Sequence, residues 1–308
     1  MKGALVRFEA KMKKLQENKR YITSVVYVVV LMLLFTLKWL VQDWGALGFD
    51  VLFCAISVIG CIEFLTAVKV VPFAQRTVTV AFCAMIIPAY VIFQMLDLGG
   101  YIPVGVIFLL YAIVVVIFGL TKFDGSNLNT TLLSMAAAGY TGLLSCVFAA
   151  VNHATENSAP LVLLMFLIVM LTDSLAYVFG KLFRRWMPQK LAPKISPNKT
   201  IIGGIGGIIG GIIAGVVAYY LWFGLSKVTG YALMYRGFLP AYVAFMLIGL
   251  VGAIVGQAGD LFESFFKRKC GIKDSGKLLP GHGGVLDRFD SMFFVGVLVW
   301  VASFLLLL

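Results

Sequence analysis

Long apolar stretches separated by short polar segments dominate the pattern along this chain. A helix needs about 20 mostly apolar residues to cross the hydrocarbon core of a bilayer. Backbone polar groups in lipid must be satisfied within their own segment, and the alternating pattern of strands is absent, so helices are expected. The pattern predicts an all-α polytopic membrane protein with about nine transmembrane helices, at Tyr21–Leu40, Gly48–Val68, Thr77–Leu96, Tyr101–Leu120, Thr131–Val151, Pro160–Phe179, Ile201–Trp222, Leu239–Gly259 and Ser291–Leu308.

The amino-acid composition also indicates an integral membrane protein. Hydrophobic residues make up 61% of the 308 residues and charged residues only 13%, whereas a soluble domain carries about 25% charged residues. No gap between the predicted spans is long enough for a separate soluble domain. We therefore divide the chain into a basic tail (1–20), N-terminal transmembrane helices (21–151) and a C-terminal transmembrane region with two polar loops (152–308), which is expected to be catalytic.

Lysine and arginine residues alternate between the two sides of the predicted helices. The tail and every second gap after it contain seven, two, one, six and six basic residues, whereas the intervening gaps contain none, none, none and two. Because basic loops stay in the cytoplasm, the N-terminus is predicted to be cytoplasmic, and an odd number of spans puts the C-terminus outside. The tail is expected to be retained before a signal-anchor helix, in a multi-pass protein of the cell membrane.

The net charge of +11 does not indicate a nucleic-acid partner, because the charges lie in the loops between spans. A membrane surface or an anionic ligand explains them better. Lys38 is the one basic residue within a predicted span, near an end from which its ammonium group can reach the interface. Two loops on the predicted cytoplasmic side, Lys181–Thr200 and Asp260–Asp290, hold twelve basic residues and five of the fourteen acids. They are expected to form the active face.

Asp173 and Glu63 are acidic residues inside predicted spans, where charges are rare. Asp173 is near the cytoplasmic end of the sixth span, and an acid at the centre of a transmembrane helix costs about 2.5–3.5 kcal/mol on insertion scales. Asp173 is therefore expected to be functional, with a helix cap or a solvated helix end as the alternative. Glu63 in the second span has no polar neighbours nearby, and structural and functional roles are equally open. His153, in an outer loop, is expected at the surface.

The loop after the eighth span contains two pairs of acids. Asp260 and Glu263 are three positions apart, so they share a face of a helix that extends the span. Asp287 and Asp290 have the same spacing at the entry to the ninth span. Carboxylates at facing helix ends suit Mg²⁺, which completes its shell with water and substrate phosphate, and basic side chains can bind the remaining phosphate charge. Glycines around His282 permit tight turns. The alternative to a metal and phosphate site is a solvated loop with internal ion pairs.

The earlier loop ends in ISPNKT, followed by many glycines. Ser196 is expected to cap a helix that begins near Pro197. Lys199 and Thr200 then lie at a helix N-terminus, where backbone N–H groups and the helix dipole favour an anion. The small residues of Gly203–Gly215 recur at intervals of four, which favours tight helix packing in lipid.

The stretch Ser264–Asp290 resembles the signature of phosphatidate cytidylyltransferases (CDP-diacylglycerol synthases). That signature reads S-x-x-K-R, K-D-S-G and P-G-H-G-G-x-x-D-R-x-D, and all three parts occur here in this order. Two upstream segments are also similar to the family, D-x-x-A-Y-x-x-G at 173–180 and S-P-x-K-T at 196–200. One departure is that many members continue with W-E-G, where this chain has Ile201 and Ile202 before Gly203, so no role is assigned to Ile202.

The resemblance implies that CTP and phosphatidate react to give CDP-diacylglycerol and pyrophosphate at the cytoplasmic membrane interface. Mg²⁺ is the implied cofactor, and a second cation is left open. By the same resemblance, Asp260 and Asp287 would bind the metal, with Asp290 and Glu263 nearby.

The remaining site residues are also implied by the resemblance. The catalytic residues would be Asp260 and Asp287 together with Lys267, Arg268 and His282. His282 would orient the loop or contact phosphate, with an acid–base role as the alternative. Contacts to CTP and phosphate are expected from Asp173, Tyr177, Ser196, Lys199, Thr200, Lys273, Asp274 and Arg288.

Two other functions are compatible with parts of the pattern. A CTP-dependent polyprenol or dolichol kinase also needs a membrane cavity and metal carboxylates, but it would release CDP and a phosphorylated alcohol. An ion-coupled transporter would use Asp173 and Glu63 along an ion path, whereas the acids of this chain cluster at one face and its halves show no repeat. The expected partners are CTP, phosphatidate and the bilayer, without nucleic acid, and a homodimer is left open.

Overall fold

The structure is a computed structural model that describes residues 23, 25–154, 158–229, 235, 237, 239–278 and 283–307. The predicted tail (1–20) and His282 lie outside the described residues. A helix at Val25–Leu40 comes first. The elements that follow are α2 (Gln42–Val68), α3 (Phe73–Met95), α4 (Tyr101–Thr121), η1 (Phe123–Gly125), α5 (Leu128–Ala137), η2 (Ala138–Leu143), α6 (Leu144–Asn152), α7 (Ala159–Leu182), β1 (Lys190–Ala192), β2 (Ser196–Thr200), α8 (Ile201–Thr229), α9 (Ala241–Lys269) and α10 (Leu286–Leu307).

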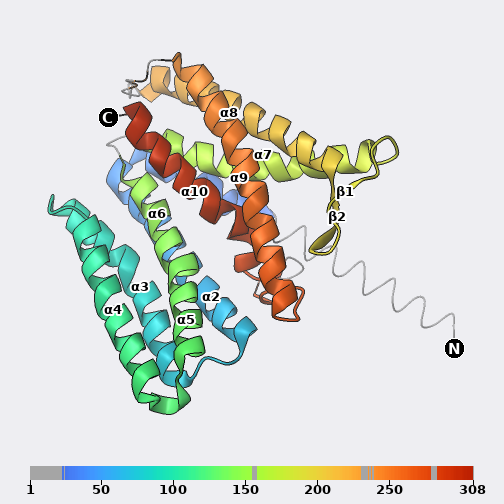
Figure 1. Ribbon diagram of the computed structural model, residues 1–308. Helices are drawn as coiled ribbons and strands as arrows, with labels where there is room; N and C mark the ends of the chain where they lie inside the picture. The colour runs from blue at the N-terminus through green and yellow to red at the C-terminus, as the bar shows by residue number, and fades with distance from the viewer. Residues whose placement is uncertain are drawn as a thin grey trace, which may run out of the picture.

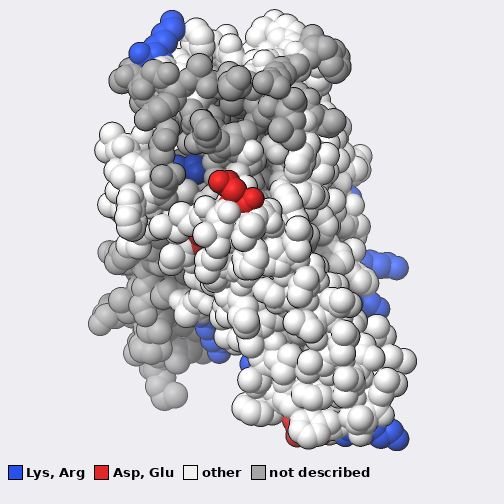
Figure 2. All heavy atoms as spheres, turned by 90° about the vertical axis from the view of Figure 1, so that its left-hand side faces the viewer, with Lys and Arg blue, Asp and Glu red and all other residues white. Residues whose placement is uncertain are grey.

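Seven helical stretches of the described part are long and apolar enough to cross a membrane, so the chain is a polytopic membrane protein. They cover the predicted second to eighth spans, except that Leu96, Leu239 and Pro240 fall outside the observed helices. The first predicted span is described only as the shorter helix Val25–Leu40, and the ninth lies in α10, whose first turn carries three charged residues. The described part therefore has seven candidate spans where nine were predicted. On the face shown in Figure 2, charged side chains are few and uncharged ones form a broad surface.

The helices form two groups that meet at α10. Figure 1 shows α3, α4 and α5 side by side, and α7, α8 and α9 packed against one another. Helix α10 contacts α9 and α7 on one side and α2 and α6 on the other. Phe293 of α10 stacks on Phe148 of α6 with ring centroids 5.6 Å apart, and Phe53 of α2 lies 5.3 Å from Phe148. This aromatic contact is fully buried, and it joins α10 to the N-terminal helices.

A short β-hairpin lies between α7 and α8, within the loop predicted to separate the sixth and seventh spans. Strands β1 and β2 pair antiparallel, with Lys190 opposite Thr200 and Ala192 opposite Ser196. The predicted helix start near Pro197 is wrong, because α8 begins at Ile201. Ser196 is a strand residue, and Thr200 takes the capping role: its Oγ1 accepts a hydrogen bond from the Gly203 N–H at 3.1 Å.

Glycines of α8 allow close packing against both neighbouring helices, as predicted. A Cβ atom at Gly210 would lie 2.4 Å from the carbonyl oxygen of Leu171 in α7. At Gly211 it would lie 2.3 Å from the carbonyl oxygen of Gly249 in α9. Helices in lipid associate largely through van der Waals contact, which small residues make possible. This packing brings the ends of α7 and α9 together beside the β-hairpin.

Two predictions for the opposite end of the bundle are wrong. Lys38 does not reach the interface: it is buried, and its Nζ donates to the backbone oxygen of Asn152 at 3.1 Å and to its side-chain oxygen. Asn152 Nδ2 in turn donates to Asp50 Oδ1 at 2.8 Å. His153 is largely buried, with Nε2 2.8 Å from Asp50 Oδ2. The buried carboxylate of Asp50 holds these groups, because charges inside a protein need partners.

We predict that Gly211→Ala destabilises the protein, because the added methyl group meets the backbone of α9. Overpacking of this kind typically costs about 1–3 kcal/mol. The control is Gly224→Ala on the same helix, where a Cβ atom meets nothing within 4 Å. Thermal unfolding in detergent should show a lower midpoint for Gly211→Ala and an equal or higher one for Gly224→Ala. Equal midpoints for both variants would contradict the close-packing account.

Candidate active site

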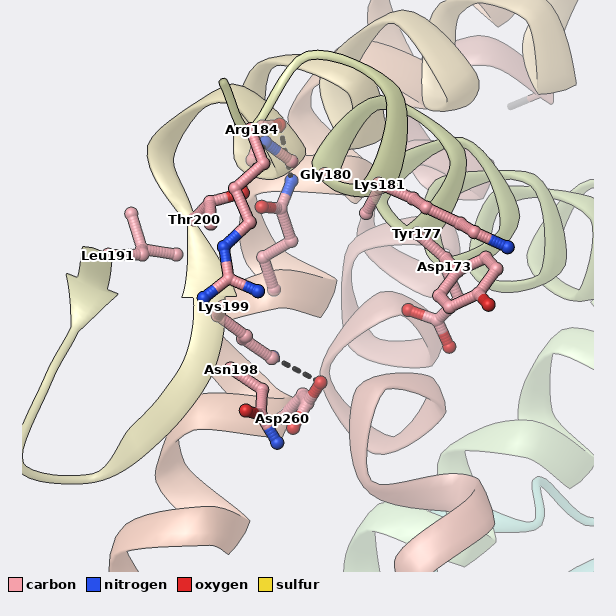
Figure 3. Close-up of a pocket in the computed structure, with 14 residues that line it drawn as sticks. Asp173, Tyr177, Gly180, Lys181, Arg184, Leu191, Asn198, Lys199, Thr200 and Asp260 are labelled. Atoms are coloured by element: carbon pink, nitrogen blue, oxygen red, sulfur yellow. Dashed lines mark hydrogen bonds and ion pairs between the residues drawn. The ribbon is translucent and has the colours of Figure 1, made fainter. Parts of the chain in front are cut away.

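A pocket of about 660 Å³ opens between α7, the β-hairpin, the start of α8 and α9. Figure 3 shows side chains of α7, the β-hairpin and α9 around it, whereas α8 contributes only Gly203 and Gly204. Its charged and amide-bearing residues are Asp173, Lys181, Arg184, Asn198, Lys199, Gln257 and Asp260. Tyr177 and Thr200 also line it. The pocket therefore collects residues of both predicted loops and of the sixth predicted span.

An ion pair between Lys199 and Asp260 crosses one wall of the pocket. Lys199 Nζ on β2 donates to Asp260 Oδ2 on α9, and both side chains are about a quarter exposed, at 27% and 26%. Asp173 on α7 faces this pair across the pocket (Figure 3) and lies within electrostatic range of both partners. Because the pair is exposed on the pocket side, its ammonium group can turn to an incoming anion.

A second ion-pair group lies deeper, between α9 and α10. Lys267 Nζ is 2.7 Å from Asp287 Oδ1 and 2.5 Å from Glu263 Oε2. Asp287 Oδ2 accepts hydrogen bonds from the N–H groups of Ser275 at 2.9 Å and Gly284 at 2.8 Å. Both oxygens of Asp287 are thus already occupied. Lys267 bridges two carboxylates, an internal ion pair of the kind given as the alternative for this loop.

Four carboxylates on three helices form an acid cluster, which we define as Asp173, Asp260, Glu263 and Asp290. Asp290 is within electrostatic range of the other three. It is 8% exposed, and its Oδ1 accepts from the N–H of Ser291 at 2.6 Å. Glu263 is fully buried, and its Oε1 has no hydrogen-bond partner in the structure.

The acid cluster is the candidate cation site in the described part of the chain. Glu263 Oε1 is a buried acceptor without a hydrogen-bond donor, although Lys267 already forms an ion pair with this carboxylate through Oε2. Carboxylate oxygens are also the ligands that Mg²⁺ prefers. As the side chains stand, however, no three His, Cys, Asp or Glu residues in the described ranges are arranged as a metal site.

Other predicted site residues are not part of the pocket lining. Arg268 donates to the backbone oxygens of Ile195 and Ile272, each at 3.4 Å, and so joins the end of α9 to the hairpin turn. Ser196 is in the hairpin ladder. The remaining three are exposed on the chain that leads into α10 or on its first turn; they are Lys273, Asp274 and Arg288.

Sequence reasoning missed several residues at this site. Lys181, Arg184 and Gln257 line the pocket. The sequence signal that could have identified them is a polar residue within an apolar span or near its end. Tyr140 was not foreseeable, because it lies in a π-helical turn that sequence does not reveal. Its buried hydroxyl has no partner in the structure and lies within range of Asp290 and other members of the acid cluster.

Comparison with known proteins gives one family and a set of bacterial relatives. The cytidylyltransferase family matches residues 18–306. The phosphatidate cytidylyltransferase of Staphylococcus epidermidis is 36% identical over 205 residues, which are 66% of this chain and 67% of that protein. The proteins of that name from Staphylococcus aureus and Staphylococcus saprophyticus are 44% and 42% identical over 135 residues, which are 44% of this chain and 45% of each relative.

We predict that Lys267→Met strongly destabilises the protein. Removing one partner of a buried ion pair typically costs about 3–5 kcal/mol, because the remaining charges stay buried. Lys269→Met is the matched control, since Lys269 is exposed two positions along the same helix. Chemical or thermal unfolding in detergent should separate the two variants. A Lys267→Met protein as stable as Lys269→Met would show that the ion-pair group contributes little to stability.

Proposed function

Because this chain belongs to the cytidylyltransferase family, we propose that its pocket joins the cytidylyl group of CTP to phosphatidate. The chain is a phosphatidate cytidylyltransferase, a nucleotidyltransferase of phospholipid biosynthesis. In the reaction, a phosphate oxygen of phosphatidate bonds to the α-phosphorus of CTP. The bond from that phosphorus to the oxygen bridging to the β-phosphorus breaks. CDP-diacylglycerol and pyrophosphate are the products.

The main support for placing the reaction in this pocket is the partly exposed Lys199–Asp260 ion pair, which is accompanied there by further cationic side chains. Both substrates are anions, so they approach each other only where positive charge neutralises them. Lys181, Arg184 and Lys199 line the same pocket, and cations bind phosphate through charge-assisted hydrogen bonds. In our proposal Lys199 leaves Asp260 for a CTP phosphate, and Thr200 and the start of α8 lie beside the nucleotide.

The acid cluster is the proposed place for Mg²⁺, whether one ion or two are bound. Asp260, Glu263 and Asp290 would hold the ion, since Glu263 Oε1 is unpartnered and Asp290 is within range of the other two. When bound, the ion supplies positive charge to the phosphates. Asp287 remains a predicted ligand, but it would have to give up contacts to Lys267 or to the backbone. Asp173 would orient the substrates from the opposite wall.

The position of the pocket also suits one substrate from the bilayer and one from water. Phosphatidate arrives laterally in the bilayer, and CTP arrives from water. In our proposal the pocket faces the cytoplasm, as the basic loops predict, in a multi-pass protein of the cell membrane. A site at this interface meets both substrates without removing the lipid from the membrane. A homodimer remains a prediction.

We predict that Asp260→Asn abolishes turnover without unfolding the protein. Loss of the carboxylate weakens the metal site and releases Lys199, so the rate should fall about 100-fold or more. Asp97→Asn is the control, because Asp97 is exposed in a turn with φ 55°, which asparagine tolerates. The assay uses purified protein with CTP, phosphatidate and Mg²⁺, and detects CDP-diacylglycerol and pyrophosphate. Near-normal activity of Asp260→Asn would remove Asp260 from the site, and CDP as product would indicate a kinase.

Lys199→Ala should chiefly weaken CTP binding. Loss of one charge-assisted hydrogen bond to a phosphate corresponds to about a tenfold rise in KM for CTP. Lys194→Ala serves as the control, since Lys194 is exposed in the hairpin turn and does not line the pocket. Steady-state kinetics with varied CTP measure both variants. An unchanged KM for Lys199→Ala would contradict the placement of Lys199 on the nucleotide.

A further inference from the structure

Glu63 of α2 binds the segment that carries the signature residues. It is 7% exposed, and its carboxylate accepts hydrogen bonds from the N–H groups of Val285 at 3.0 Å and Leu286 at 2.8 Å. The Ser275 hydroxyl donates a third hydrogen bond at 3.2 Å. In the sequence Glu63 has no polar neighbours nearby, but in the fold three hydrogen-bond donors surround its carboxylate. All of them come from more than 200 residues farther along the chain.

The start of α10 requires such a partner. The first N–H groups of a helix have no acceptor within the helix and need another one when they are buried. Val285 and Leu286 are both buried, and neither Gly284 nor Val285 offers a side-chain oxygen as a cap. Glu63 supplies the acceptor from a different helix. Its negative charge also complements the positive end of the α10 dipole.

Two glycines of the signature are explained by the same carboxylate. A Cβ atom at Gly276 would lie 2.1 Å from Glu63 Oε1, and one at Gly284 would lie 2.4 Å from Glu63 Oε2. Neither position has room for a side chain while Glu63 occupies its place. Gly276 and Gly284 therefore leave the space that the carboxylate of Glu63 occupies.

Asp287 holds the same segment from the other side. It accepts from the N–H groups of Ser275 and Gly284, while Glu63 contacts the Ser275 hydroxyl and the two residues after Gly284. The chain before α10 is thus fixed between two carboxylates. The first turn of α10, which carries Asp287 and Asp290, takes its place from this double contact.

We propose that Glu63 is a positioning residue for nucleotidyl transfer, which places the first turn of α10 so that Asp290 joins the acid cluster. The inference rests on the proposed function of that cluster. It makes α2 part of the active site, although the reacting groups were all expected from residues 152–308. Glu63 itself contacts no substrate: it acts through the backbone of Val285 and Leu286.

Glu63→Gln tests the proposal, because it keeps the size of the side chain but turns an N–H₂ group toward N–H donors. We expect kcat to fall about 10- to 100-fold and the half-saturating Mg²⁺ concentration to rise, as found for residues that orient metal ligands. KM for CTP should change less than kcat. The matched control is Asp50→Asn, which removes an equally buried carboxylate (6% exposed) from the same helix but far from the pocket, among Asn152 and His153. It should lower stability without changing kcat or the Mg²⁺ requirement per folded molecule.

Hydrogen–deuterium exchange provides a readout that does not depend on activity. Peptides covering 283–290 should exchange faster in Glu63→Gln than in the parent protein or in Asp50→Asn. Ser275→Ala, which removes only one of the three donors, should change kcat and exchange in the same direction by a smaller amount. Parental kcat, Mg²⁺ dependence and exchange in Glu63→Gln would overturn the proposal, as would equal effects of Asp50→Asn. If the parent protein makes no CDP-diacylglycerol, the proposed function fails, whereas faster exchange would still report the role of Glu63 in placing α10.

Discussion

Buried carboxylates need positive or hydrogen-bond-donating partners, and the active region of this protein is organised around that requirement. A charge removed from water costs several kcal/mol unless other groups compensate it. Asp260 is compensated by Lys199 from β2, and Glu263 and Asp287 by Lys267. Glu63 is compensated by the hydroxyl of Ser275 and the free N–H groups at the start of α10. Apart from Lys267–Glu263, which lies within α9, each of these contacts joins separate segments. The same interactions therefore neutralise the charges and place the site.

The transmembrane packing brings these segments within reach of one another. Glycines of α8 permit backbone contact with α7 on one side and α9 on the other. Helix α9 then extends to Lys269 and carries Asp260, Glu263 and Lys267 from the pocket wall toward α10. Because α10 packs on aromatic residues of the N-terminal helices as well, the pocket is supported by both helix groups. Close packing is therefore a condition for the chemistry and not only for stability.

Lys199 and Lys267 differ in their ability to bind an incoming phosphate. Lys199 has one carboxylate partner and is partly exposed to the pocket, so an incoming phosphate can compete for it. Lys267 has two carboxylate partners and is 14% exposed, so its ammonium group is retained between α9 and α10. In our proposal the first binds nucleotide and the second maintains the arrangement of acids. Both lysines belong to segments that resemble the family, and only the tertiary structure shows how their surroundings differ.

The sequence by itself determined the membrane-spanning class, the family and the two loops that meet at the pocket, because apolar length and motif spacing are local properties of the chain. It also indicated Asp173, Lys199 and Asp260, which all line the pocket. Only the tertiary structure revealed the β-hairpin, the partners of Lys38 and His153, the π-helical turn at Tyr140 and the contacts of Glu63. These features depend on which groups from distant segments meet in a low-dielectric interior. The pattern of a single segment carries no information about a partner that lies more than 200 residues away.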